Sequence, residues 1–150
     1  MKYNIETSVK ISASASKVWE VLTDLKAYPS WNPFITKLEG DLEEGEKLNA
    51  IIGGMKFKPT IMVLRKTDEL RWLGRLLFPG IFDGEHRFQI IENGPNSCTF
   101  IQSEKFNGIL VGMFKKKLDT ETVGGFEAMN EALKHRCEKI EELSSNTVIK

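Results

Sequence analysis

The chain has 150 residues, of which 41% are hydrophobic and 28% are charged, a composition typical of one globular domain and unlike a disordered chain. Lys and Arg total 21, as do Asp and Glu, so a net charge near zero supplies no long-range attraction for nucleic acid or anionic lipid. The sequence has no apolar stretch near the roughly 18 residues that span a bilayer and no signal-peptide pattern at its start, so we expect a cytoplasmic protein.

Residues 3–11 alternate between apolar and polar side chains, which predicts a half-buried strand. Ser14 is the expected N-cap of a helix, because apolar residues follow it at helical spacing. Pro29 and Pro33 end this helical region and leave room for one short turn around Tyr28. The predicted order therefore begins with a strand and short helices.

In residues 34–106, strand-length segments are separated by turn signals, which predicts an antiparallel meander. The turn signals lie at residues 40–45, 53–54, 67–69, 79–84 and 93–96. The pair Gly53-Gly54 favours a type I′ hairpin, which needs positive φ at both positions. Six strands after the first helix, and seven in all, are expected.

A long helix is predicted after residue 112, because apolar side chains recur every three or four residues over about 30 residues. Its predicted inner face is Phe114, Leu118, Thr122, Phe126, Met129, Leu133, Cys137 and Ile140. Gly124-Gly125 interrupts the pattern and suits either a bend or a close approach to another group. Residues 143–150 are expected to be a frayed tail of the single domain 1–150. One curved antiparallel sheet with one long helix is an α+β architecture.

Four stretches carry a family resemblance: Ile11–Trp19, Tyr28–Phe34 (Tyr-Pro-Ser-Trp-Asn-Pro-Phe), Gly84–Phe88 and Gly125–Asn130. Together they resemble the START-like (SRPBCC) superfamily, and within it the bacterial polyketide cyclase/dehydrase-like subgroup. The resemblance implies a helix-grip fold, in which a seven-stranded curved antiparallel sheet wraps around a long C-terminal helix. It also implies a cavity between them. Superfamily members bind lipids, sterols, hormones, quinones or polyketides, and some are enzymes, so a shared fold implies no particular reaction.

The turn at residues 93–96 sets the pairing of its two flanking strands, whose partner numbers sum to about 190. His86 then faces Glu104, and Phe88 faces Gln102, on the apolar side of the sheet. A buried imidazole beside a carboxylate can hold the polar end of a ligand or transfer protons, and it can equally be a structural pair.

The same arithmetic for the next hairpin predicts that Val63 faces Trp72 and that Ile61 faces Gly74. Trp31, beside two prolines, either lines the cavity mouth or fixes the short helix in place. The remaining apolar positions are core or cavity lining, which share one surface in this fold. The candidate ligand-contacting residues are Trp31, Phe57, Ile61, Trp72, Gly74, His86, Phe88, Phe100, Gln102, Glu104, Phe126, Met129 and Leu133.

No cofactor and no metal are expected, because phosphate-binding, nucleophile-elbow and zinc motifs are missing from the sequence. Cys98 and Cys137 lie far apart and are expected to be free thiols in the core. The run Lys115–Lys117 is interpreted as solvated surface.

The first functional hypothesis is binding or transport of a small hydrophobic ligand, such as a lipid, an aromatic compound or a polyketide-like molecule, in the internal cavity. The second is a cyclase/dehydratase-type lyase in which His86 and Glu104 transfer protons. The third is a protein-interaction module whose cavity is filled. The sequence does not indicate an oligomeric state.

Overall fold

The computed structural model describes residues 1–76 and 78–149, with side chains described through residue 144. Its first elements are β1 (Lys2–Ile11), α1 (Ala15–Thr23), a 3₁₀ turn (Leu25–Ala27) and α2 (Tyr28–Trp31). The middle of the chain forms β2 (Ile35–Glu39), β3 (Asn49–Ile52), β4 (Met55–Phe57), β5 (Thr60–Arg65), β6 (Glu69–Leu76), β7 (Phe82–Gly94) and β8 (Ser97–Asn107). The C-terminal part forms α3 (Val111–Lys117), a π-helical segment (Leu118–Thr122) and α4 (Val123–Ile149).

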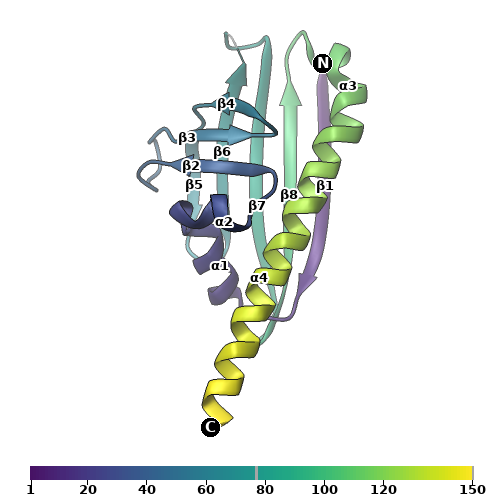
Figure 1. Ribbon diagram of the computed structural model, residues 1–150. Helices are drawn as coiled ribbons and strands as arrows, with labels where there is room; N and C mark the ends of the chain where they lie inside the picture. Colours follow the sequence, from purple (N-terminus) through teal and green to yellow (C-terminus); the bar gives the residue numbers. More distant parts are fainter. Residues whose placement is uncertain (77, 150) are drawn as a thin grey trace.

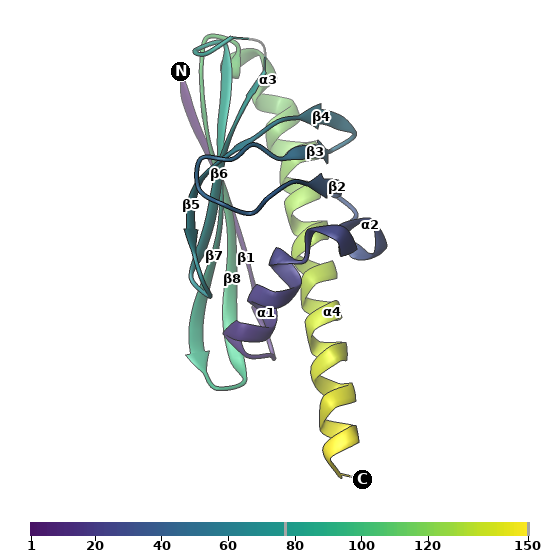
Figure 2. The same cartoon turned by 90° about the vertical axis from the view of Figure 1, so that its left-hand side faces the viewer.

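The strands form two antiparallel sheets, one with the order β1-β8-β7-β6-β5 and one with the order β2-β3-β4. The larger sheet lies on one side and the long helix on the other, with α1 and the smaller sheet closing the gap between them (Figures 1 and 2). The predicted α+β helix-grip arrangement is confirmed. The strand count differs: the described residues form eight strands in two sheets instead of seven in one. The reason is Pro59, which lacks a backbone donor and separates β4 from β5.

The register of β7 and β8 matches the prediction, with His86 opposite Glu104 and Phe88 opposite Gln102. The predicted pairing of β5 with β6 is wrong. A register shift between Ile61 and Val63 places Ile61 opposite Trp72. Next to the turn, Arg65 pairs with Glu69, which is already one residue away from the predicted register. The bulge between Ile61 and Val63 adds a second residue, which arithmetic based on a regular hairpin does not anticipate.

Ser14 caps α1 as predicted, because its hydroxyl accepts a hydrogen bond of 3.1 Å from the backbone N–H of Lys17. After α2 the chain turns sharply into β2. The Asn32 side-chain oxygen accepts from the backbone N–H groups of Phe34 and Ile35 at 2.9 and 2.8 Å. This turn directs the Phe34 ring toward α4.

Gly125 lets the Phe34 ring reach the helix backbone, since a Cβ atom there would lie 2.2 Å from Phe34 Cδ1. Gly125 therefore serves a close approach, and the irregular π-helical segment comes just before the glycine pair. The backbone of α4 is helical to Ile149, through most of the tail predicted to be frayed, and Lys150 lies outside the described residues. No helix in the described part of the chain has the length and apolarity needed to cross a membrane.

The larger of the two hydrophobic clusters lies where α1 and the middle of α4 meet the hairpin end of β7 and β8. Its fully buried members include Leu22, Phe88, Phe100, Met129 and Leu133. Cys98 and Cys137 belong to the same cluster and are free thiols, as predicted. The opposite end of the interior is not filled, and the candidate site lies there.

Candidate functional site

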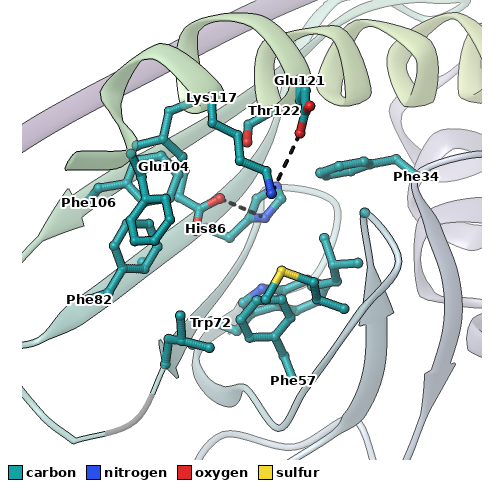
Figure 3. Close-up of a pocket in the computed structure, with 18 residues that line it drawn as sticks. Phe34, Phe57, Trp72, Phe82, His86, Glu104, Phe106, Lys117, Glu121 and Thr122 are labelled. Carbon is teal, nitrogen blue, oxygen red and sulfur yellow. Dashed lines mark ion pairs between the residues drawn. The ribbon is translucent and has the colours of Figure 1, made fainter. Parts of the chain in front are cut away.

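A cavity of about 230 Å³ lies between the large sheet, the β3-β4 hairpin and the helical segment from α3 to the start of α4 (Figure 3). Its apolar lining consists of Phe34, Ile52, Met55, Phe57, Trp72, Leu76, Phe82, Phe106, Phe114 and Leu118. Its polar lining consists of His86, Glu104, Lys117, Glu121 and Thr122. A mostly apolar wall with a few convergent polar groups is typical of a small-molecule site.

Two glycines facing each other on adjacent strands, Gly74 of β6 and Gly84 of β7, form part of the cavity wall. A Cβ atom on Gly84 would lie 2.1 Å from Glu104 Oε2, so the carboxyl group occupies the space that a side chain would need. A Cβ atom on Gly74 would meet nothing closer than the Gly84 carbonyl oxygen at 3.9 Å. Gly84 therefore positions a carboxyl group, and Gly74 leaves space.

The His86 imidazole is enclosed by aromatic rings. It stacks on Phe88 and Phe126, with centroid distances of 4.3 and 4.8 Å, and meets the edge of Trp72 at 5.5 Å. This burial lowers the pKa of His86 to about 4, although a hydrogen bond with Gln102 acts in the opposite direction. At neutral pH the ring is uncharged.

A chain of hydrogen bonds fixes which nitrogen of His86 carries the proton. The Thr7 hydroxyl donates to the backbone carbonyl of Gln102 at 3.3 Å, so its oxygen accepts from Asn130 Nδ2 at 2.9 Å. Asn130 Oδ1 accepts from Gln102 Nε2 at 2.8 Å. Gln102 Oε1 is thereby left facing His86 Nε2 at 2.8 Å, and it accepts the Nε2 proton. The neutral ring then presents the lone pair of Nδ1 toward Glu104.

Glu104 Oε1 lies 3.4 Å from His86 Nδ1 (Figure 3). Burial raises the pKa of Glu104 to about 8, because the apolar cavity disfavours the carboxylate. Glu104 is therefore mainly a carboxylic acid at neutral pH, and its O–H suits the lone pair of Nδ1. The 3.4 Å separation exceeds a normal hydrogen bond. The pair as a whole is uncharged.

Lys117 and Glu121 approach the cavity from the helical side, one turn apart, with Lys117 Nζ 3.7 Å from Glu121 Oε2 (Figure 3). Both side chains are exposed, at 57% and 70%. Their charges are therefore hydrated at the mouth, whereas the cavity interior contains the neutral pair.

Among the candidate ligand-contacting residues, the structure brings five together in the cavity wall: Phe57, Trp72, Gly74, His86 and Glu104. The other eight are not in it: Trp31, Ile61, Phe88, Phe100, Gln102, Phe126, Met129 and Leu133. Seven of these eight are buried in the hydrophobic interior, where the helices pack directly against the large sheet. Trp31 instead packs on Tyr28, with ring centroids 5.1 Å apart, and lines a separate hollow between α1 and α4.

Several cavity residues were missed by the sequence analysis, although signals for two of them were present. Phe106 continues the alternation of Gln102 and Glu104 along β8, which places it on the same face. Phe82 does the same on β7, which begins earlier than expected because Gly84 lies within the strand and not in a turn. Phe34 had no periodic signal, since a turn positions it.

Among the described residues, no group of three or more His, Cys, Asp or Glu side chains is arranged to hold a metal ion. Cys98 and Cys137 are poor nucleophiles at neutral pH, because burial raises their pKa values to about 11 and about 12. The titratable groups in the cavity interior are the neutral carboxylic acid of Glu104 and the neutral imidazole of His86.

Comparison with known proteins gives fold matches over nearly the whole chain. A START superfamily protein from Mycobacterium smegmatis is 24% identical, with a TM-score of 0.70 and coverage of 91% of this chain and 98% of that chain. Norcoclaurine synthase from Thalictrum flavum is 17% identical, with a TM-score of 0.74 and coverage of 94% and 97%. The Zhui aromatase/cyclase from Streptomyces sp. R1128 is 18% identical, with a TM-score of 0.71 and coverage of 93% and 95%.

These identities are too low to carry a function from one protein to another, so the structural matches establish the fold. No match is found among curated proteins. The sequence model of one family, described as polyketide cyclase / dehydrase and lipid transport, matches residues 2–138. This match covers both sheets, the cavity and most of α4. The chain therefore belongs to the family of polyketide cyclases/dehydrases and lipid-transport proteins.

Proposed function

We propose that the protein binds a small apolar molecule in the cavity and holds a neutral polar group of that molecule, a hydroxyl or a carbonyl, against Glu104. The observation that carries this proposal is the uncharged Glu104–His86 pair inside an aromatic cavity. A carboxylic acid can donate to a carbonyl and accept from a hydroxyl, so it suits either group.

An anionic ligand group is disfavoured at this depth. A carboxylate beside Glu104 would lie in an apolar environment, where an unpaired charge costs several kcal/mol. The basic side chain in the described cavity lining is Lys117, which is hydrated at the mouth and shared with Glu121. The cavity also remains open, which argues against an interaction module with a filled interior.

The test uses the uncharged dye Nile red as a probe of the cavity, displaced by a naphthol or by the corresponding naphthoate at neutral pH. We expect the naphthol to displace the dye at about tenfold lower concentration, which corresponds to one hydrogen bond gained and one buried charge avoided. The Glu104→Leu variant should lose the part of this preference that comes from the hydrogen bond, while the cost of burying the naphthoate charge remains. Glu121→Gln, which changes a carboxyl group at the mouth, should retain it.

Equal displacement by the two compounds would contradict the proposed role of Glu104, even if the dye binds. Failure of Nile red to bind would contradict the binding function itself. The two results thus separate the choice of ligand group from the existence of the site.

A second candidate function is dehydration or cyclisation of a ligand with several carbonyl groups. It is favoured by a specific observation: with its pKa raised to about 8, Glu104 is a proton donor at neutral pH, and the lone pair of His86 Nδ1 lies beside it. A β-hydroxy ketone tests this candidate, because loss of water yields an enone that absorbs in the ultraviolet. Turnover that disappears in Glu104→Gln while Nile red still binds would support it.

A further inference from the structure

One end of the molecule carries three large apolar side chains that are almost fully exposed. Phe78, Ile109 and Met113 are exposed at 75%, 76% and 75%. Phe78 lies between β6 and β7, Ile109 lies between β8 and α3, and Met113 lies one helical turn further along the chain. Both connections lie at the end opposite the C-terminus (Figures 1 and 2). We call these three residues the apolar tip.

The two loops that carry the tip are bonded to each other. Ile109 N–H donates to the Gly80 carbonyl at 3.1 Å, and Leu110 N–H donates to the Ile81 carbonyl at 3.0 Å. Gly108 has φ of 139°, and a Cβ atom there would lie 2.4 Å from the Ile81 oxygen, so glycine is required for this contact. The tip is therefore a built surface, formed by segments far apart in the sequence.

Basic residues flank the tip on α3. Among the side chains described, through residue 144, Lys115 and Lys116 form no ion pair with a carboxylate, and Lys115 lies over the Tyr3 ring at 5.4 Å. Of the nearby acids, Asp119 accepts a hydrogen bond from the Tyr3 hydroxyl. Asp83 accepts from the Gly80 N–H at 3.1 Å and lies 3.6 Å from Arg75. The neutral Tyr3 hydroxyl does not cancel the charge of Asp119, so Lys115 and Lys116 together with Asp119 leave a net positive charge beside the tip.

We propose that the apolar tip inserts into the surface of an anionic phospholipid bilayer, while Lys115 and Lys116 contact the headgroups. Exposed apolar side chains beside lysines are the pattern of peripheral membrane contact. We favour a bilayer over a protein partner because the lysines beside the tip complement anionic headgroups. This inference does not depend on which ligand, if any, fills the cavity.

The loops that carry the tip lead directly into the cavity wall. Phe82 and Phe114 follow the two tip-bearing loops, pack edge to face with centroids 5.5 Å apart, and line the cavity. These two rings therefore connect the tip-bearing loops to the cavity wall. Docking would bring the cavity next to the bilayer, where apolar molecules are stored.

The experiment is flotation of the full chain with vesicles of phosphatidylcholine alone or mixed with phosphatidylserine. We expect binding to the mixed vesicles, at least tenfold weaker binding for the double variant Phe78→Asp/Ile109→Asp, and about fivefold weaker binding for each of Lys115→Gln and Lys116→Gln. Salt at about 1 M should reduce binding, because it screens the lysines. The matched control is Met62→Asp, which changes an exposed apolar residue of β5 away from the tip. It should bind like the unmodified chain.

Absence of binding to mixed vesicles by the unmodified chain would overturn the proposal, and so would an equal loss in Met62→Asp. Sedimentation velocity separates a further outcome. If the chain forms a dimer that Phe78→Asp/Ile109→Asp dissociates, a second copy covers the tip and the membrane proposal is wrong. Nile red binding and circular dichroism of each variant establish that the fold and the cavity are intact.

Discussion

The two ends of the interior are built on the same two strands, β7 and β8, but differ in their packing. At the hairpin end, β7 and β8 present Phe88, Ile90 and Phe100, and helices cover them. At the other end, Gly84, His86 and Glu104 alternate with no further bulky core residue except the rings of Phe82 and Phe106, and a cavity remains. The difference shows that an open site in this fold arises from a few small or polar residues on otherwise regular strands, and from where α1 stops.

His86 marks the boundary between the packed half and the open half. Its ring stacks on Phe88 and Phe126 in the core, while its Nδ1 faces Glu104 in the cavity. The hydrogen bonds that orient it run through Gln102 into the packed half. The packed half therefore determines which nitrogen of His86 carries the proton, and so which nitrogen faces the cavity with its lone pair.

The largest expected effect compares one phenylalanine from each half. Phe100 is completely buried, so Phe100→Ala should lower the free energy of unfolding by about 3–5 kcal/mol, through lost burial and the cavity left behind. Phe57 lines the existing cavity and is half-buried, so Phe57→Ala should lower it by about 1 kcal/mol or less. Urea unfolding measures both values. Similar losses would mean that the open half is packed as tightly as the core.

The next effect is the pH dependence that the open half imposes. Between pH 6.5 and 8, Glu104 has lost its proton in the unfolded chain and retains it in the folded chain, since the pKa is raised from 4.5 to about 8. The folded state then binds more protons, so stability falls as pH rises, by about 1 kcal/mol over this range once the smaller opposite contribution of His86 is included. Between pH 4.5 and 6.5 the trend is cancelled, because unfolded His86 binds a proton that folded His86, with a pKa of about 4, does not.

Urea unfolding over a pH series measures this profile. Glu104→Gln should remove the decline above pH 6.5, since glutamine does not titrate. A decline that persists in this variant would assign the pH dependence to another group. Phe100→Ala, which leaves the titrating pair in place, should shift the whole profile downward without changing its slope.

The packed half was largely predictable from sequence, and the open half was not. Alternation along β8 and helical spacing along α4 predict that Phe100, Phe126, Met129 and Leu133 face inward, and all four are fully buried. The position of the turn between β7 and β8 predicts that His86 lies opposite Glu104, because the turn fixes which residues pair in a hairpin. Periodicity identifies which side chains face inward. It does not show where other side chains pack against them and where a cavity remains.

The open volume of the cavity depends on three-dimensional features that leave no local pattern in the sequence. The register shift of β5 places Ile61 opposite Trp72 and not opposite Gly74. On its other side, β6 pairs with β7, where Gly74 faces Gly84. Phe34 reaches the cavity through a turn and a glycine on a helix almost a hundred residues away. The sequence places Gly84 in a turn, because glycine is common in turns. A glycine within a strand, opposite a side chain that occupies the space of its missing Cβ atom, is much rarer.

The smallest expected effect on stability, and the most specific test of the open half, compares its two facing glycines. In Gly84→Ala the new methyl group would overlap Glu104 Oε2, so the carboxyl group must rotate away from His86. Because the tip of a flexible side chain can move, the free energy of unfolding should fall by less than about 1 kcal/mol. Displacement of Nile red by a naphthol should nevertheless become about tenfold weaker, as the hydrogen-bonding group is no longer in position. Gly74→Ala adds the same methyl group with its nearest neighbour at 3.9 Å, and it should leave naphthol binding within about twofold of the unmodified chain. Equal losses in the two variants would mean that cavity volume, and not the placement of the Glu104 carboxyl group, determines binding.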